Sequence, residues 1–322
     1  MKGAGRLRVY SIPMRTRFRG ITSRDGVLIH GPEGWGEFSP FPDYGPQEAA
    51  RWLAAAREAA YDGWPAPVRD RVPVNVTVPP VGPDEAHEMT RASGCRTAKV
   101  KVAEPGQTDD EDLDRVEAVR DAIGPGGRIR VDVNGGWDVD HAARMIRTLD
   151  RFELEYVEQP CATLEELADV RRRVDVPVAA DESIRRAEDP LEVRARGAAD
   201  IVVLKVQPLG GVRNALRIAE ECGLPVVVSS AVETSVGLAA GLALAAALPE
   251  LPYACGLATL SLLEGDVVTD PLVPVGGELQ VRRPEPDERA LTRYEVDGGE
   301  WWHRVARAQA LLDGPPVTGT FR

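Results

Sequence analysis

The sequence predicts an α/β protein in which a parallel (β/α) barrel carries a smaller α+β capping domain. Two regularities support this fold class. From about residue 72 onward, short apolar segments alternate with amphipathic ones, as is typical of repeated βα units. Ionisable residues recur near the ends of these apolar segments, where a barrel of parallel strands builds its active site. The length of 322 residues suits one barrel with a modest second domain.

Residues 1–90 are predicted to form the capping domain. Segments 6–14 and 26–41 have the composition of strands and are broken by Gly and Pro turns. Segment 46–63 is predicted to be a helix, because Pro46 stands at its start and Gly63 closes it.

Two stretches of this domain are candidates for covering the barrel mouth. Segment 16–26, TRFRGITSRDG, combines glycines with basic residues, which suits a mobile lid over an anionic substrate. Stretch 35–40, WGEFSP, fits either a tight turn with aromatic packing or a further part of the same cover.

Eight apolar segments follow, with seven helical stretches between them. They predict a modified (β/α)8 barrel of the (β/α)7β type, which we place at residues 91–270, with a first strand that begins near residue 72. The polar, Pro-rich segment 271–322 is expected to pack back on the capping domain and complete it. The eight segments are VPVNVTV, TAKVKVA, RIRVDVN, EYVEQ, PVAADES, DIVVLKVQ, PVVVSSA and PYACGL.

Composition argues against several classes of partner. Lys and Arg number 39 against 51 Asp and Glu, a net charge of −12, so nucleic acid is not an expected partner. The longest apolar run, residues 236–248, is shorter than the roughly 20 residues that cross a bilayer. No apolar signal segment opens the chain, and the four cysteines form no C-x-x-C motif. We therefore expect a cytoplasmic protein with reduced thiols and no membrane partner.

Ionisable residues follow the strand repeat closely. Steps of 26, 23 and 24 residues separate four of them, which is one βα unit each time. Because the carboxyl ends of barrel strands meet at one mouth, we expect all of these side chains to converge there. They are Lys99 and Lys101, Asp132, Glu158, Asp181 and Lys205.

The strand order predicts how these side chains face one another. Eight strands divide a circle into steps of roughly 45°. Lys101 on the second strand and Lys205 on the sixth would therefore lie on opposite sides of the mouth, with the three carboxylates in the arc between them. Three carboxylates form a ligand set for Mg²⁺, with Mn²⁺ as a substitute. Zinc fits less well, because the arc offers no histidine and only one cysteine.

This arrangement suits removal of a proton next to the carboxylate of a small-molecule substrate. A metal ion would stabilise the enediolate that forms, and a lysine with a lowered pKa would take the proton. Lys99, two residues before Lys101 on the same strand face, would lower the pKa of Lys101 by its positive charge.

Each residue taken alone has a simpler interpretation. A K-x-K pattern on a strand is usually a solvated face, and Asp181 or Asn134 could cap the helix that follows it. Six ionisable groups in phase with the strand repeat favour the active-site interpretation. The four histidines fall outside the strand ends, and Cys161 and Cys255 are expected to be buried small hydrophobes.

Taken in order, the motifs TAKVKV, VDVN, EYVEQP, AADES and VVLKVQPLGG resemble the muconate-lactonizing-enzyme subgroup of the enolase superfamily. The resemblance covers nearly the whole chain. It implies that Asp132, Glu158 and Asp181 are the Mg²⁺ ligands and that Lys101 and Lys205 are the acid/base lysines. It also implies that Lys99 tunes Lys101. Asn134 and Glu182 would support the metal site.

Within the subgroup, the stretches RFRGITSRDG, GWGEFSPF, VPVNVTVP, SSAVETSVG and ACGLAT resemble a family of hydro-lyases of menaquinone biosynthesis. That family converts 2-succinyl-6-hydroxy-2,4-cyclohexadiene-1-carboxylate to o-succinylbenzoate. The resemblance implies that Lys101 abstracts the proton and then protonates the departing hydroxyl, while Lys205 makes a cation–π contact with the ring. Arg19 would help to close the lid. Candidates to hold the succinyl end through backbone N–H groups are Ser229, Ser230 and Gly256.

Several alternatives share this framework. An N-succinylamino acid racemase, as a second or main activity, would use the same two lysines. A dipeptide epimerase is less favoured, because segment ACGLAT lacks the D-x-D of that family and no acid follows until Glu264. No feature favours a muconate cycloisomerase, and a non-catalytic scaffold would be expected to have lost some of these residues. The sequence shows no apolar stripe that would predict an oligomer, and it leaves the oligomeric state open.

Overall fold

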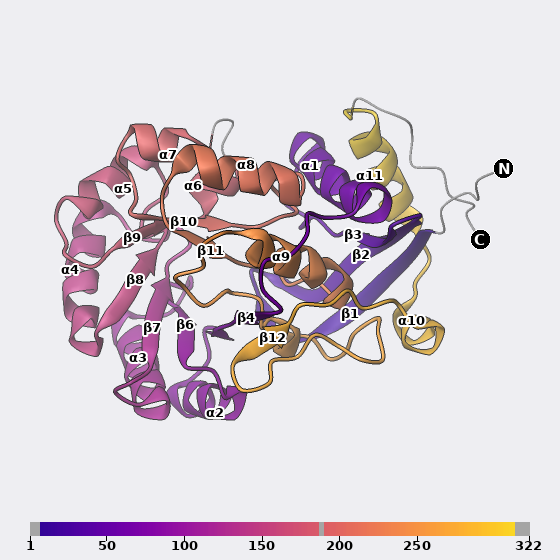
Figure 1. Ribbon diagram of the computed structural model, residues 1–322. Helices are drawn as coiled ribbons and strands as arrows, with labels where there is room; N and C mark the ends of the chain where they lie inside the picture. Colours follow the sequence, from indigo (N-terminus) through magenta and orange to yellow (C-terminus); the bar gives the residue numbers. More distant parts are fainter. Residues whose placement is uncertain (1–6, 187–189, 313–322) are drawn as a thin grey trace.

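The computed structural model describes residues 7–186 and 190–312 (Figure 1). Two units lie side by side in it. One is a curled parallel sheet surrounded by helices, and the other is a smaller antiparallel sheet with helices on its outer side. No helix within these ranges is long and apolar enough to cross a membrane.

The barrel is built on a seven-stranded parallel sheet in the order β11-β10-β9-β8-β7-β6-β5, so consecutive strands are neighbours throughout. Helices between the strands cover the outside, as expected for right-handed βα units. The strands are β5 (Val76–Val78), β6 (Thr97–Lys101), β7 (Arg128–Asp132), β8 (Leu154–Glu158), β9 (Val178–Ala180), β10 (Ile201–Leu204) and β11 (Val226–Val228). The helices are α2 (Pro83–Ser93), α3 (Asp109–Ile123), α4 (Val139–Leu149), α5 (Leu164–Arg171), α6 (Glu182–Arg185), α7 (Glu192–Ala195), α8 (Val212–Cys222) and α9 (Ser235–Ala247).

The eighth predicted strand segment, PYACGL, closes this sheet into a barrel. Cys255 pairs in parallel with Val74, just before β5, and Gly256 pairs with Ser229, just after β11. Backbone hydrogen bonds of 2.7 and 2.8 Å join Cys255 to Pro73 and Gly256 to Val228. The predicted (β/α)7β barrel is thereby confirmed, with a last strand reduced to single bridges on either side.

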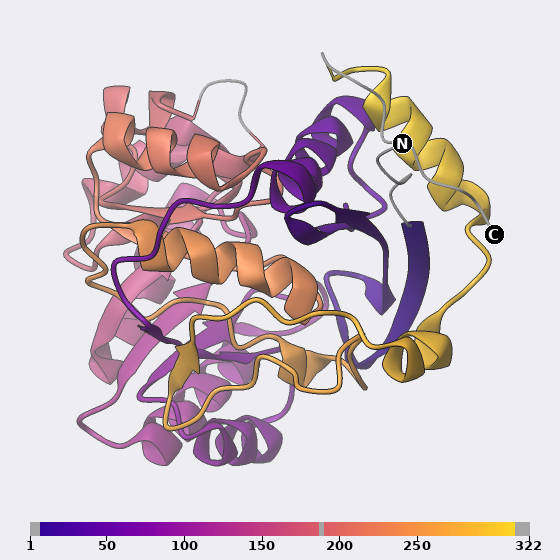
Figure 2. The same ribbon diagram turned by 45° about the vertical axis from the view of Figure 1, so that its right-hand side comes forward.

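Local sequence explains where the helices begin. Thr108 and Thr163 cap α3 and α5, and each forms a capping box with the Glu three residues later. Helix α9 is rich in small residues and almost entirely buried, because it lies between the barrel sheet and the capping unit (Figure 2). Its first residues follow directly on the loop at the carboxyl end of β11.

The capping unit is an antiparallel sheet of β1 (Leu7–Phe18), β2 (Ile21–Gly31) and β3 (Gly34–Phe38). Segment 26–41 contains parts of β2 and β3, divided by a turn that contains Pro32, as its Gly and Pro residues predict. The predicted helix begins as α1 (Pro46–Arg57) and continues as a π-helical turn, η1 (Glu58–Asp62), which ends at Gly63. The capping unit has a small apolar core of its own, which includes Val27, Ile29, Trp52 and Leu53.

The C-terminal segment crosses from the barrel to the capping unit. Strand β12 (Glu278–Gln280) pairs with β4 (Arg71–Pro73), and α10 (Glu288–Tyr294) contacts β1. Helix α11 (Gly299–Gln309) packs against α1 on the outer side of the capping unit (Figure 2). The domain limits 1–90, 91–270 and 271–322 stay a proposal alongside this arrangement.

The predicted lid segment 16–26 belongs to a β-hairpin, with its turn at Arg19 and Gly20. The tip of the hairpin reaches the barrel mouth. Within this segment Arg24 is 2% exposed and donates a hydrogen bond across to Val232 of the barrel, and the lid role stays a prediction.

Candidate active site

The strand ends bring the predicted ionisable residues together. Lys101, Asp132 and Glu158 end β6, β7 and β8, and the sheet register places each directly beside the next. Asp181 follows β9, and Lys205 follows β10 at the same edge. The parallel register at the carboxyl ends of successive strands is therefore what assembles this row of charges.

These charges are paired with one another at short range. Lys101 Nζ lies 2.6 Å from Asp132 Oδ2, and Lys99 Nζ lies 2.9 Å from the same oxygen. Lys99 also donates to Glu158 Oε1 at 2.8 Å. On the other side, Lys205 donates to Asp181 Oδ2 at 2.5 Å. All six side chains are buried, so each pair interacts with little screening by water.

Burial and ion pairing shift the pKa values of the three carboxyl groups in different directions. Burial opposes ionisation of Asp132 and Asp181, but Lys101 and Lys99 beside the first, and Arg185 and Lys205 beside the second, hold the pKa of both well below the usual range. Burial and then the neighbouring Asp132 raise the pKa of Glu158 to about 7. The row therefore contains two strongly ionised carboxylates and one that resists ionisation.

The lysines differ as well. Burial would lower the pKa of Lys99, yet Asp132 and Glu158 outweigh it and raise that pKa well above its ordinary value. Burial dominates at Lys205 and lowers its pKa, although Asp181 acts in the opposite direction. Lys99 is thus held as a permanent cation, whereas Lys205 loses its proton more readily.

Carboxylate oxygens are suitable ligands for a hard divalent cation, but in this structure they form ion pairs with lysines. Within residues 7–186 and 190–312, no three Asp, Glu, His or Cys side chains already surround a common point. Two buried carboxylate oxygens, Glu158 Oε2 and Glu182 Oε2, nevertheless have no hydrogen-bond partner. Buried charged oxygens without donors are costly, and a cation at this edge would satisfy them. The residues present therefore fit an oxygen-ligated metal.

Asn134 and Glu182 lie where support of such a site requires. Asn134 Oδ1 accepts from Lys101 Nζ at 2.5 Å, and its Nδ2 donates to Glu182 Oε1 at 3.1 Å. Asp181 precedes α6 but makes no capping hydrogen bond with its side chain. Helix capping consequently does not explain this aspartate.

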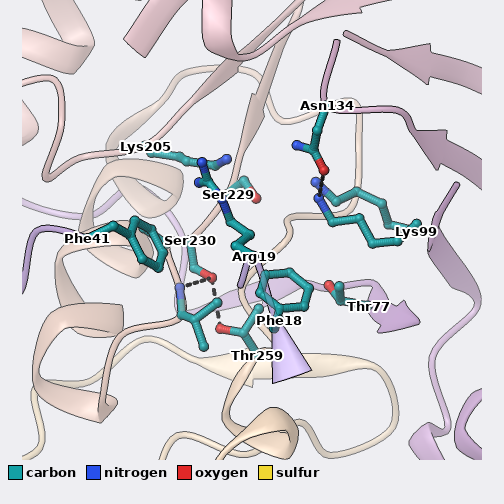
Figure 3. Close-up of a pocket in the computed structure, with 13 residues that line it drawn as sticks. Phe18, Arg19, Phe41, Thr77, Lys99, Asn134, Lys205, Ser229, Ser230 and Thr259 are labelled. Carbon is teal, nitrogen blue, oxygen red and sulfur yellow. Dashed lines mark hydrogen bonds between the residues drawn. The ribbon is translucent and has the colours of Figure 1, made fainter. Parts of the chain in front are cut away.

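A small cavity opens beside the row of charges (Figure 3). Barrel residues form one part of its wall, and the capping unit contributes the rest. Figure 3 shows Lys205 on one side, Lys99 and Asn134 on the other, and Phe18 and Arg19 between them. The lining residues are Phe18, Arg19, Phe41, Thr77, Lys99, Lys101, Asn134, Lys205, Ser229, Ser230, Ala231, Val232 and Thr259.

The serines line this cavity, but not in the way expected. The backbone N–H groups of Ser229, Ser230 and Gly256 donate to the carbonyl oxygens of Leu204, Gly256 and Val228 at 2.8–3.0 Å, in bonds between neighbouring barrel strands. These N–H groups therefore already have partners within the barrel, and a role of these residues in substrate binding stays a prediction. Gly256 lacks a place in the cavity wall, and a Cβ there would lie 2.4 Å from Ser229 Oγ. Ser230 Oγ pairs with Thr259 Oγ1 at 2.8 Å and accepts from the backbone N–H of Val232, whereas Ser229 Oγ has only a long contact of 3.5 Å with the carbonyl oxygen of Gly256.

Arg19 brings a further positive charge to the cavity. It adopts the left-handed conformation, with φ of 50°, at the hairpin turn. Its guanidinium lies 4.7 Å from the centre of the Phe41 ring, while Lys101 Nζ lies 5.4 Å from the Phe18 ring. Aromatic rings of the capping unit thus contact cations that face the cavity.

Sequence reasoning missed several residues of this site. Arg185 is buried, donates to Asp181 at 3.0 Å and to Glu182, and contacts Tyr44 Oη from the capping unit. Its position four residues after Asp181, one helical turn on, was a signal that could have found it. Phe41, Thr77 and Thr259 carried no comparable signal, because only the tertiary fold brings them to the cavity.

Family comparisons agree with this architecture. Residues 9–60 match the model of enolase N-terminal domain-like sequences, and residues 83–286 match that of enolase C-terminal domain-like sequences. Among solved structures, the muconate lactonizing enzyme of Pseudomonas fluorescens superposes with a TM-score of 0.78 at 23% identity, covering 92% of this chain and all of that one. The L-Ala-D/L-Glu epimerase of Bacillus subtilis gives 0.75 at 24% identity, over 92% and 99%. At these identities the likeness establishes the fold.

Curated relatives are much closer. An o-succinylbenzoate synthase of Thermobifida fusca is 72% identical over 306 residues, which cover 95% of this chain and 96% of that protein. An o-succinylbenzoate synthase of Mycobacterium ulcerans is 55% identical over 313 residues, covering 95% and 94%. With its fold, its row of charges and these relatives, the chain belongs to the o-succinylbenzoate synthase family of lyases within the enolase superfamily.

Proposed function

We propose that this protein dehydrates 2-succinyl-6-hydroxy-2,4-cyclohexadiene-1-carboxylate to o-succinylbenzoate, a step of menaquinone biosynthesis. The observation that carries the proposal is the pair of buried lysines, Lys101 and Lys205, whose side chains line one cavity from opposite sides of a row of three carboxylates. The names of the close relatives supply the product, o-succinylbenzoate, and the sequence resemblance implies the substrate.

Asp132, Glu158 and Asp181 would hold Mg²⁺, with Asn134 and Glu182 supporting them. When bound, the cation supplies positive charge against the substrate carboxylate and the negative charge that grows there. Binding of a cation would also offset the free-energy cost of burying these carboxylates, one of which has an oxygen that accepts no hydrogen bond. Mn²⁺ would serve in the same oxygen set.

Lys101 is the proposed base and acid of the reaction. As a neutral amine, it takes the proton from the ring carbon that bears the carboxylate, and the electron pair moves into the enediolate. Return of that pair expels the 6-hydroxyl, which leaves as water after Lys101 gives the proton back. The ring becomes aromatic, and no other reactant is consumed. Asn134, hydrogen-bonded to Lys101, orients the amine toward the cavity.

Lys205 and the far wall would bind the rest of the substrate. From the opposite side, the Lys205 ammonium faces the ring and stabilises its negative charge through a cation–π contact. Arg19, Ser229 and Ser230 offer a cation and two hydroxyl groups to the succinyl carboxylate. These substrate-binding roles stay proposals, with side chains in place of the backbone N–H groups first expected.

An N-succinylamino acid racemase is the second candidate. A racemase needs a proton carrier on each face of the reacting carbon, and Lys101 and Lys205 satisfy that requirement. Burial lowers the pKa of Lys205, so this lysine is able to act as a base as well as a cation. Both substrates carry a succinyl group and a carboxylate.

The purified protein with Mg²⁺ is expected to convert the cyclohexadiene carboxylate with loss of its ultraviolet absorbance. The same preparation is tested for racemisation of N-succinyl amino acids by polarimetry. Fast dehydration with slow racemisation supports the synthase, whereas fast racemisation with poor dehydration assigns the main function to the racemase. Isothermal titration with Mn²⁺ tests the metal site separately, and absence of binding would contradict the assigned ligands.

A further inference from the structure

The barrel loop 229–234, which follows β11, forms one wall of the cavity through four consecutive residues. Within it, Val232 has φ of 62°. A β-branched residue with positive φ is a genuine outlier, and conformations of this kind persist only where surrounding contacts impose them. A bond within the loop, from the Ala231 N–H to Glu233 Oε2 at 2.8 Å, contributes to this shape, and contacts from outside the loop contribute as well.

Arg24 of the capping unit makes one of these outside contacts. Its Nε donates to the carbonyl oxygen of Val232 at 3.0 Å, so the bond is made at the strained residue itself. The other end of the guanidinium donates to Ser39, and its face lies 4.5 Å from the centre of the Phe41 ring. One buried cation thus fixes the loop and, at the same time, Phe41 on the neighbouring wall.

Glu37 makes the second contact, at the other end of the loop. Its buried carboxylate accepts from Tyr10 Oη and Ser39 Oγ, both at 2.8 Å and both within the capping unit. The second carboxylate oxygen accepts from Thr234 Oγ1 and from the backbone N–H of Gly237 at 3.1 Å. These donors belong to the amino-terminal turn of α9, where a negative charge is favourable.

Glu58 provides an internal comparison. This buried carboxylate of the capping unit accepts from the backbone N–H groups of Val212 and Arg213 at the start of α8. The capping unit therefore docks on two neighbouring barrel helices by the same chemistry. Only the Glu37 contact follows a loop that lines the cavity, because none of residues 206–211 belongs to the cavity wall.

We propose that Arg24 and Glu37 are positioning residues for substrate binding, which hold loop 229–234 from the capping unit in the shape that forms the cavity wall. Neither residue lines the cavity, so both act through the loop. The inference rests on the proposed function for the identity of the substrate, but not for the contacts. When the capping unit docks correctly on the barrel, it thereby forms the cavity wall that would bind the succinyl end of the substrate.

The test compares Glu37→Gln with Glu58→Gln in the full-length protein. With Mg²⁺ present, KM and kcat are measured with the cyclohexadiene carboxylate, and the Kd of o-succinylbenzoate is measured by calorimetry. Glu37→Gln is expected to raise KM and the product Kd about 10-fold, with a smaller change in kcat, because it removes charged hydrogen bonds that hold the wall. Glu58→Gln is expected to leave both constants near the wild-type values.

Hydrogen exchange supplies a readout that needs no substrate. Glu37→Gln is expected to lower protection of peptides covering residues 231–237, whereas Glu58→Gln lowers it at 212–215. If Glu37→Gln fails to fold, the comparison is repeated with Arg24→Met. Its control is Arg283→Met, because Arg283 donates to the carbonyl oxygens of Trp35 and Ala59, away from the cavity.

The outcomes separate the two proposals. Equal losses of thermal stability in Glu37→Gln and Glu58→Gln, with KM, product Kd and exchange at 231–237 unchanged, would show a purely structural role and overturn the inference. If the wild-type protein neither dehydrates the diene nor binds the product, the proposed function fails. The exchange comparison then still decides whether Arg24 and Glu37 hold the loop.

Discussion

Replacement of Lys101 by alanine is expected to lower kcat for dehydration by about 10²–10⁴-fold, the range that a positioned acid/base group contributes. The reason is geometric. Lys101 ends β6 next to Asp132 and lines the cavity, and no other described amine shares its side of the row except Lys99. Lys99 is held as a cation by Asp132 and Glu158, which raise its pKa, so it is unable to replace the lost base. Single-turnover absorbance measurements with Mg²⁺ test this expectation.

The control for Lys101→Ala is the integrity of the rest of the site. Lys99 and Asn134 still contact the neighbouring carboxylates, so Mn²⁺ binding and far-ultraviolet circular dichroism should stay near the wild-type values. A variant that folds, binds Mn²⁺ and turns over at a near-normal rate would refute the assigned role. A loss of both rate and metal binding would instead assign Lys101 to support of Asp132.

How far the sequence predicts this site depends on how local each signal is. Lys101, Asp132 and Glu158 were found because each occupies the last position of a strand, and the parallel register then sets them side by side. The regular length of the βα units carries that information along the chain. The fold class and the superfamily follow from the same regularity, and the comparisons confirm both.

Contacts between the two units have no such signal. Glu37 and Arg24 are bonded to residues about 200 positions away, and no local pattern distinguishes them from solvated charges. The sequence also showed Ser229 and Gly256 as candidates without revealing that the pairing of barrel strands uses their backbone N–H groups. The Ser229 N–H donates to Leu204 of β10 and the Gly256 N–H donates to Val228 of β11, pairings that only the folded structure shows.

The three carboxylates of the row differ in how many cationic side chains lie beside them. Asp132 and Asp181 each have two cationic neighbours among Lys99, Lys101, Lys205 and Arg185, whereas Glu158 shares Lys99 with Asp132. Glu158 is therefore the member of the row for which burial in the metal-free protein is least compensated.

Replacement of Glu158 by glutamine is expected to weaken Mn²⁺ binding by more than about 100-fold, beyond the loss typical of residues that only support a ligand. The same change should stabilise the metal-free protein by roughly 1–2 kcal/mol at pH 8. The pKa of Glu158 is raised to about 7 by burial and by Asp132. Its contribution to stability is therefore complete below its unfolded pKa of about 4.5 and is lost as the pH rises through 7. Glutamine stays neutral and escapes that loss.

Thermal unfolding with and without Mg²⁺ should then reverse the order of the two proteins. In chelator at pH 8, Glu158→Gln unfolds at the higher temperature, and at pH 5 the difference shrinks because wild-type Glu158 is then largely protonated in the folded protein. With Mg²⁺ at 100 times its Kd, the wild type gains about 2.7 kcal/mol that the variant does not. Glu104→Gln, at an exposed carboxylate, is the matched control and should change neither result. A wild-type protein more stable than Glu158→Gln in chelator at pH 8 would contradict the idea that this carboxylate is kept for the metal at the expense of the fold.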